Sequence, residues 1–172
     1  MKNFKLFGGK QIDDLGEYLR NYYKLNPRVK IFVGTDSLQN GKFTKYVTTV
    51  NMLHPEHLDE NGNFHYSAGV HIVYRRDNVK RIRDIYSRLW RETELTFEVA
   101  SYVHDALKDV WTQPLNINEK IPIVHLDFSA QPKFKSHQVH DVSVGYIKGQ
   151  GFLCDVKPKA WAATYASDWL CH

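Results

Sequence analysis

The sequence predicts a single α/β domain, residues 1–172, built on a mixed five-stranded sheet with helices on its faces. Three β-rich stretches follow one another in the first half of the chain, and a long helical repeat with two further strands occupies the second half. The chain has 172 residues, of which 42% are hydrophobic, and this is enough to bury one sizeable core.

The first half predicts a helix followed by a three-stranded antiparallel meander. Ile12, Leu15 and Leu19 recur at helical spacing within Gln11–Leu25, which we interpret as an N-terminal extension of the domain. A nearly continuous apolar run then indicates a strand buried on both faces, and two stretches rich in Val, Thr and Tyr follow it. These three predicted strands are Val29–Asp36, Phe43–Leu53 and Phe64–Tyr74.

The second half predicts two helix–strand units and a closing helix. Apolar residues keep a 3.6-residue period from about Asn78 to Trp111, which indicates one long helix. The remaining predicted elements are a strand at Ile121–Phe128, a helix at Ser136–Lys148, a strand at Phe152–Val156 and a helix from Ala160 onward. Strands joined through helices lie parallel, so these two strands extend the meander into a mixed sheet.

The amino-acid composition limits the classes of protein to which this chain can belong. The net charge of +4 and the isoelectric point near 9.0 permit a polyanionic partner without demanding one. Two cysteines are too few for a disulfide scaffold, and no apolar run approaches the roughly 18 residues of a membrane span. The N-terminus lacks the apolar segment of a signal peptide. We therefore expect a cytoplasmic protein with reduced thiols and no membrane association.

Two acidic residues follow apolar strands and are candidates for a metal site. Asp36 ends the first predicted strand, and Asp127 lies near the end of the fourth. If these strands are parallel neighbours, the two carboxylates meet at one edge of the sheet, where open α/β sheets bind ligands. Carboxylates this close repel unless a cation lies between them, and oxygen ligands suit Mg²⁺ or Mn²⁺. The alternative is that each Asp only begins a turn.

Two further carboxylates could complete such a site. On the long helix, Glu92 lies about 60° from the direction of the buried Leu89, at the edge of the sheet-facing side. Glu98, the competing residue, lies on the far side and is expected to be solvated. On the last helix Asp168 follows small residues that allow close approach to the sheet, and Asp155 on the last strand competes with it. The residues alone leave this last choice open.

Five segments of the chain resemble the RNase H-like superfamily, and within it the YkuK-like family of uncharacterised bacterial proteins. They are GTDS (34–37), RETELTFEVAS (91–101), HLDFS (125–129), VGYIKGQGF (144–152) and KPKAWAATYASD (157–168). Spread in order over most of the chain, they carry the resemblance across the whole predicted domain.

The resemblance implies a metal-dependent nuclease that hydrolyses phosphodiester bonds by a two-metal mechanism. It implies that Asp36, Glu92, Asp127 and Asp168 are both catalytic residues and ligands of Mg²⁺ or Mn²⁺, and it favours Asp168 over Asp155. Glu92 and Glu98 both lie in the shared stretch, so there only the helical periodicity favours Glu92. The implied partner is RNA, DNA or a hybrid of the two.

Basic residues supply a second indication of a nucleic-acid partner. One set lies within residues 75–91 and consists of Arg75, Arg76, Lys80, Arg81, Arg83, Arg88 and Arg91. The other set consists of Lys133, Lys135, Lys148, Lys157 and Lys159. The alternative function is a non-catalytic nucleic-acid-binding or adaptor protein that retains the same fold, since a fold does not determine function.

Overall fold

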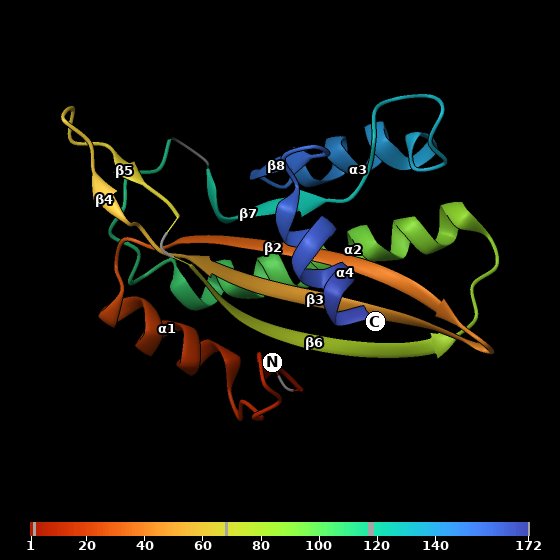
Figure 1. Ribbon diagram of the computed structural model, residues 1–172, viewed down its shortest axis with the longest axis horizontal. Coiled ribbons are helices and arrows are strands. Elements are labelled where there is room, and N and C mark those ends of the chain that lie inside the picture. Colours follow the sequence, from red (N-terminus) through yellow and green to blue (C-terminus); the bar gives the residue numbers. More distant parts are fainter. Residues whose placement is uncertain (2, 68, 117–118, 172) are drawn as a thin grey trace.

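The protein folds around a six-stranded mixed sheet (Figure 1). The computed structural model describes residues 1, 3–67, 69–116 and 119–171. The strands lie in the order β1-β6-β3-β2-β7-β8, and β2, β3 and β6 form an antiparallel meander. β7 runs parallel to β2, and β8 runs parallel to β7, as predicted. The bounds are Lys5–Leu6 for β1, Lys30–Asn40 for β2, Phe43–Leu53 for β3, Val70–Lys80 for β6, Lys120–Leu126 for β7 and Phe152–Val156 for β8.

The prediction of five strands in the sheet is wrong, because the sheet contains a sixth strand, β1. β1 adds to the outer edge of β6 through the pairs Lys5↔Tyr74 and Leu6↔Val73. Two residues are too few to show an alternating pattern, so periodicity could not reveal this strand. The remaining strands, β4 (His57–Leu58) and β5 (Phe64–His65), form a separate hairpin. The predicted strand Phe64–Tyr74 is therefore wrong over its first residues, because β5 belongs to this hairpin and the sheet strand β6 begins only at Val70.

Helices cover both faces of the sheet, and one face carries more helices than the other. α1, α2 and α3 lie on one face, and the C-terminal helices η1 and α4 cross the other (Figure 1). The bounds are Leu15–Leu25 for α1, Ile85–Leu107 for α2, His137–Gly149 for α3, Ala162–Ser167 for the π-helix η1 and Asp168–Cys171 for α4. Among the described residues, no helix is both long enough and apolar enough to cross a membrane.

Capping residues explain why two helices begin later than the periodic pattern predicts. Asp84 accepts a hydrogen bond from the Ser87 backbone N–H at 2.7 Å and starts α2, so the predicted helix from Asn78 is wrong over its first turns. Residues 78–80 instead prolong β6, and residues 81–84 connect it to α2. Asp14 accepts a hydrogen bond from Glu17 N at 2.7 Å and starts α1 in the same way.

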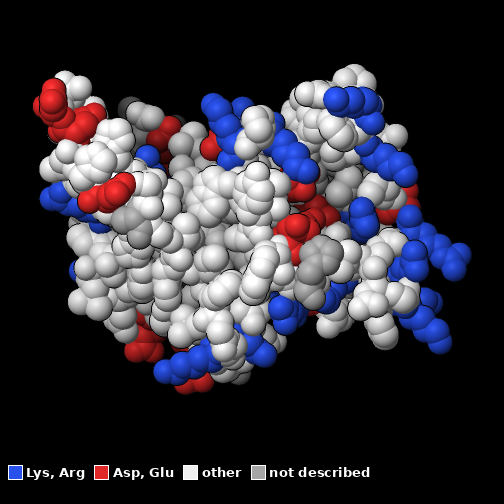
Figure 2. Space-filling model, in the orientation of Figure 1, with Lys and Arg blue, Asp and Glu red and all other residues white. Residues whose placement is uncertain are grey.

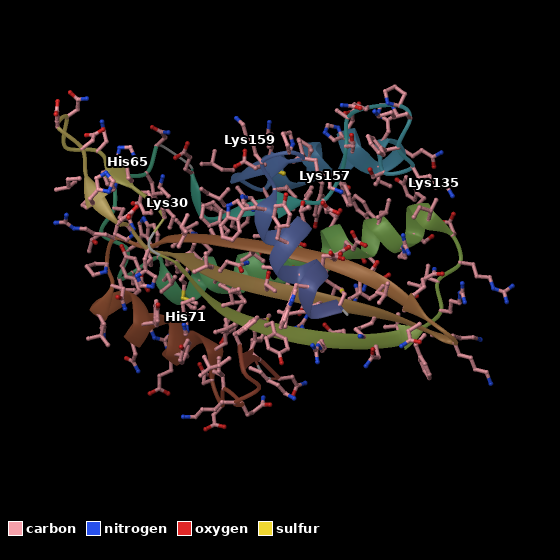
Figure 3. All side chains as sticks on the ribbon, viewed as in Figure 1. Lys30, His65, His71, Lys135, Lys157 and Lys159 are labelled. Carbon is pink, nitrogen blue, oxygen red and sulfur yellow. The ribbon has the colours of Figure 1, made fainter. Side chains whose placement is uncertain are left out.

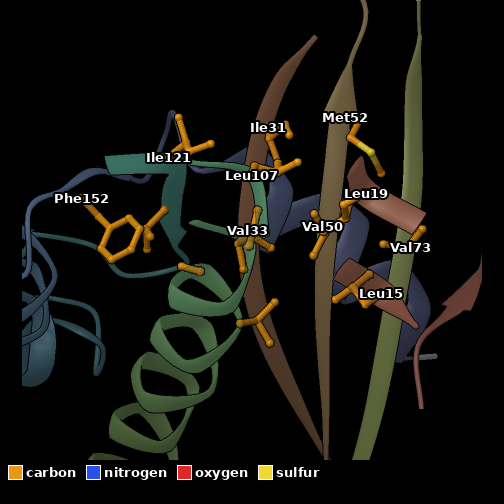
Figure 4. Packing of buried hydrophobic residues seen from close by; sticks show 14 of the residues in the cluster. Leu15, Leu19, Ile31, Val33, Val50, Met52, Val73, Leu107, Ile121 and Phe152 are labelled. Carbon is orange, nitrogen blue, oxygen red and sulfur yellow. The ribbon is translucent and has the colours of Figure 1, made fainter. Parts of the chain in front are cut away.

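The main hydrophobic core lies between the sheet and the face covered by α1 and α2. Leu15 and Leu19 of α1 pack there with Val33 of β2, Val50 of β3 and Leu107 of α2 (Figure 4). The opposite face has a much smaller apolar cluster, consisting of Val47, Tyr74, Leu170 and Cys171. The short C-terminal helices therefore pack on the sheet through few side chains, and close backbone approach matters more on that side.

Candidate functional site

The β2–β7 pair brings Asp36 and Asp127 to the same place. The parallel register runs from Phe32↔Ile123 to Thr35↔Leu126, so Asp36 and Asp127 are the next residues along each strand. β2 itself continues to Asn40, paired with β3, so Asp36 does not end its strand as expected. It follows the last residue that pairs with β7, and beyond this point one edge of β2 is open.

The π-helix η1 is fastened to this part of the sheet through small residues. A Cβ added to Gly34 would lie 2.7 Å from Ala163 N, so only glycine permits this approach. Ser167 Oγ donates a hydrogen bond to the Gly34 carbonyl at 3.1 Å, and Ala162 N donates to His125 Nδ1 at 3.1 Å. This docking brings Asp168, the residue after η1, into a side-chain hydrogen bond with Asp36.

Glu92 approaches from the opposite face of the sheet. Adjacent residues of a strand point to opposite faces, so Ser37 faces α2 while Asp36 faces η1. Ser37 Oγ donates a hydrogen bond to Glu92 Oε1 at 2.5 Å, and the Glu92 residue is only 2% exposed. The charge of Asp36 acts on Glu92 from the other face of the sheet.

Burial and mutual repulsion make ionisation of two of these carboxylates unfavourable. Burial raises the pKa of Asp36 to about 7, and the charges of Asp127 and Asp168 add to the rise, against the lowering effect of the Ser37 backbone N–H. Burial also raises the pKa of Glu92 well above its usual range, and the charge of Asp36 contributes in the same direction. The site therefore favours whatever neutralises it, either protons or a cation.

Asp127 is already paired with a cation from the chain itself. Lys157 Nζ lies 3.0 Å from Asp127 Oδ1, and Thr164 Oγ1 donates a hydrogen bond to the same oxygen at 2.5 Å. In the part of the chain that the structure describes, no three His, Cys, Asp or Glu side chains lie in an arrangement that could hold a metal ion. The four predicted carboxylates are nevertheless close enough for their charges to interact, and Ser37, Thr164 and Lys157 already contact Asp36, Glu92 and Asp127.

The two competing carboxylates have other contacts. Glu98 Oε1 accepts a hydrogen bond from Arg75 Nη1 at 3.0 Å, and its side chain is about half exposed. Asp155 lies opposite His125 in the β7–β8 register, with its Oδ2 3.8 Å from His125 Nε2. The structure thus buries Glu92 rather than Glu98, and it places Asp168 rather than Asp155 against Asp36.

The two predicted basic sets differ in how much charge they leave available. Within residues 75–91, Arg75 is buried between Asp77 and Glu98, and Arg91 pairs with Glu94. Figure 3 labels three lysines of the second set, with Lys135 near α3 and with Lys157 and Lys159 near β8. Figure 2 shows Lys and Arg side chains around an exposed acidic patch on the face that η1 and α4 cross. Two members of the first set are therefore already paired with acidic residues of the chain.

Sequence reasoning did not assign the donors that orient the carboxylates. Ser37 donates to Glu92 and Thr164 donates to Asp127, but neither hydroxyl residue was among the predicted site residues. The prediction assigned Lys157 to nucleic-acid binding, whereas the structure pairs it with Asp127. The only signal in the sequence for the role of Ser37 is its position directly after Asp36 in the segment GTDS. The other two contacts join residues about 30 positions or more apart, and local patterns do not reveal such contacts.

The raised pKa values predict a pH-dependent gain in stability when Asp36 is replaced by Asn. Between about pH 4 and pH 7 the folded protein holds a proton at Asp36 that the unfolded chain has released, so stability falls across this range and the full cost of the ionised carboxylate is reached above about pH 7. Without metal, Asp36→Asn is expected to raise the unfolding free energy by about 2 kcal/mol at pH 8, and by much less near pH 5.

Denaturant unfolding in a chelator at the two pH values measures this effect. Glu98→Gln is the matched control, because it removes one charge from a partly exposed ion pair, and its effect should stay small. A gain for Asp36→Asn that is equal at both pH values would show that repulsion and burial of the charge are not its cause.

Comparison with protein families gives one match. The model of a family described as Ribonuclease H-like matches residues 12–171, which is nearly the whole chain. Comparison with curated proteins and with solved structures found no match. The matched range begins at α1 and ends at α4, so it includes all four predicted carboxylates.

Proposed function

The chain belongs to the ribonuclease H-like family, and from this premise we propose that it is a metal-dependent nuclease. Its catalytic residues would be Asp36, Glu92, Asp127 and Asp168, acting on phosphodiester bonds of RNA, DNA or a hybrid. The finer placement in the YkuK-like family belongs to the same proposal and rests on the five shared segments.

The observation that carries the proposal is the place where acidic side chains meet: Asp36 and Asp127 directly follow the last paired residues of β2 and β7, and Glu92 is only 2% exposed. A carboxylate as buried as Glu92, near a second acid of raised pKa, costs stability unless it is compensated. Carboxylate oxygens are the type of ligand that Mg²⁺ and Mn²⁺ prefer. Bound ions of this type would activate a water molecule and stabilise the leaving oxygen.

The chain's own residues have distinct tasks in this proposal. Asp36 is central, because Asp168 bonds to it directly and the charges of Glu92 and Asp127 act on it. Ser37 holds Glu92 and Thr164 holds Asp127, so both carboxylates are oriented before substrate arrives. Lys157 would leave Asp127 when a cation binds, and its ammonium group would then be free to contact a phosphate.

A second candidate function is a non-catalytic nucleic-acid-binding or adaptor protein. The specific observation in its favour is the Lys157–Asp127 pair, which neutralises one carboxylate without any metal. In that case the four acidic residues would persist in a fold that binds nucleic acid through its basic side chains alone.

Cleavage of a labelled panel separates these two functions. The panel contains single- and double-stranded DNA and RNA, an RNA–DNA hybrid and a four-way junction, incubated with Mg²⁺, Mn²⁺ or a chelator. The nuclease proposal expects cleavage of at least one member in either metal and none in chelator. Binding of a member without cleavage in either metal would favour the adaptor function.

A further inference from the structure

Exposed aromatic side chains gather next to Asp168. The residue Tyr165 is 70% exposed and Trp169 is 65% exposed, one on each side of Asp168 in the chain. Trp169 stacks on Phe7, with ring centroids 5.0 Å apart and planes inclined by 30°. Phe7 is itself about half exposed, so the pair forms a supported aromatic platform. Contiguous exposed apolar surface of this kind marks an interaction site.

These rings line a hollow that reaches the acidic site. Arg76, Tyr165, Asp168 and Trp169 surround an open space of about 550 Å³. This volume lies within the range of ligand sites in proteins. Asp168 belongs both to this hollow and to the carboxylate group, through its hydrogen bond with Asp36. A molecule seated in the hollow therefore lies directly beside the proposed catalytic residues.

A fixed cation forms another wall of the hollow. Arg76 Nη2 donates a hydrogen bond to the Leu170 carbonyl at 2.9 Å, and its guanidinium lies over the Tyr74 ring, 5.1 Å from the centroid. A guanidinium has five N–H donors, so this anchoring leaves others to bind a phosphate. Aromatic faces together with a positioned arginine are the features that recognise an unpaired base and its backbone.

We propose that this hollow holds an unpaired base next to the bond to be cleaved, so that the substrate is single-stranded nucleic acid or a frayed end. A base inside a duplex is stacked on both sides and cannot offer its face to Tyr165 or Trp169, whereas an unpaired base can. This inference rests on the proposed function, since it takes the acidic site as the place of reaction. Beyond the proposed function, it specifies that the nucleic-acid substrate is unpaired where it binds.

Binding without metal tests the inference apart from catalysis. Fluorescence anisotropy compares a labelled single-stranded oligonucleotide with the blunt duplex of the same sequence, in chelator. Wild type should prefer the single strand, and Tyr165→Ala and Trp169→Ala should each weaken that binding by about 10-fold or more. The conservative variants Tyr165→Phe and Trp169→Phe keep a ring and should retain most of the affinity.

The control is Tyr86→Ala, which removes an aromatic residue of α2 that is 43% exposed and does not line the hollow. Single-strand affinity should be unchanged by this substitution. Far-UV circular dichroism of each Ala variant should match wild type, because both target rings are largely exposed. Tight duplex binding by wild type, or unchanged single-strand affinity in folded Tyr165→Ala and Trp169→Ala, would overturn the inference.

The two proposals fail in different ways. Metal-dependent cleavage of a blunt duplex that Trp169→Ala leaves unchanged would overturn the inference and leave the nuclease function standing. Ring-dependent binding of single strands with no cleavage in Mg²⁺ or Mn²⁺ would support the inference about strandedness and contradict the nuclease.

Discussion

Replacing Asp36 by Asn is expected to lower the rate of phosphodiester cleavage by about 100-fold or more, the scale seen when one preorganised electrostatic group is lost. Asp36 is the carboxylate on which the other acidic groups converge, through a hydrogen bond with Asp168 and the charges of Glu92 and Asp127. Removing its charge would remove the centre of the proposed cation site. Single-turnover cleavage of the substrate identified in the panel measures the effect.

Metal-dependent stability gives a second readout that does not require activity. A cation present at 100 times its dissociation constant stabilises the folded state by about 2.7 kcal/mol, so the melting temperature of wild type should rise with Mg²⁺ or Mn²⁺. Asp36→Asn should show little of this rise. An equal rise in the variant would place the cation elsewhere on the protein.

Asp155→Asn is the matched control for both readouts. It removes the same charge from a partly exposed carboxylate on β8 that lies beside His125. Cleavage and the metal-induced rise in melting temperature should therefore stay close to wild type, whereas Asp168→Asn should reduce both. The reverse order, with Asp155→Asn the more damaging change, would show that Asp155 takes the fourth position.

Gly34→Ala is expected to destabilise the fold by about 3 kcal/mol, at the upper end of the cost of overpacking a core. The added Cβ would lie 2.7 Å from Ala163 N and 2.9 Å from Ala163 Cα, and backbone atoms cannot move aside as a flexible side chain can. The η1 helix would have to lift from β2. Because Asp168 follows η1, cleavage and metal binding should weaken together with stability.

Gly145→Ala is the comparison variant, because it is expected to increase the stability of the fold rather than decrease it. Gly145 lies in α3 with nothing within 4 Å of the added Cβ, so alanine should stabilise the helix by about 0.5–1 kcal/mol. Denaturant unfolding of the two variants beside wild type measures both changes. A loss below about 1 kcal/mol for Gly34→Ala would mean that η1 does not depend on this close contact.

Local periodicity was sufficient for much of the framework. The bounds of β3 and β8 agree with the prediction, because turn residues limit each of these strands. Helical spacing alone distinguished Glu92 from Glu98, and the structure buries the first and exposes the second. The mixed sheet followed from strands joined through helices, whereas the pairing of β7 with β2 was only a condition of the sequence argument and is supplied by the structure.

The contacts that make the site were decided by the tertiary structure. Asp127 is paired with Lys157, Glu92 reaches the site from the face opposite Asp36, and a π-helix carries Asp168 to it. The start of α2 also depended on a single capping residue that the apolar period does not register. The sequence by itself determined which residues lie on which side of each element, because that depends on the repeat of the local backbone. Only the tertiary structure decided which side chains meet, because pairing depends on contacts between segments far apart in the chain.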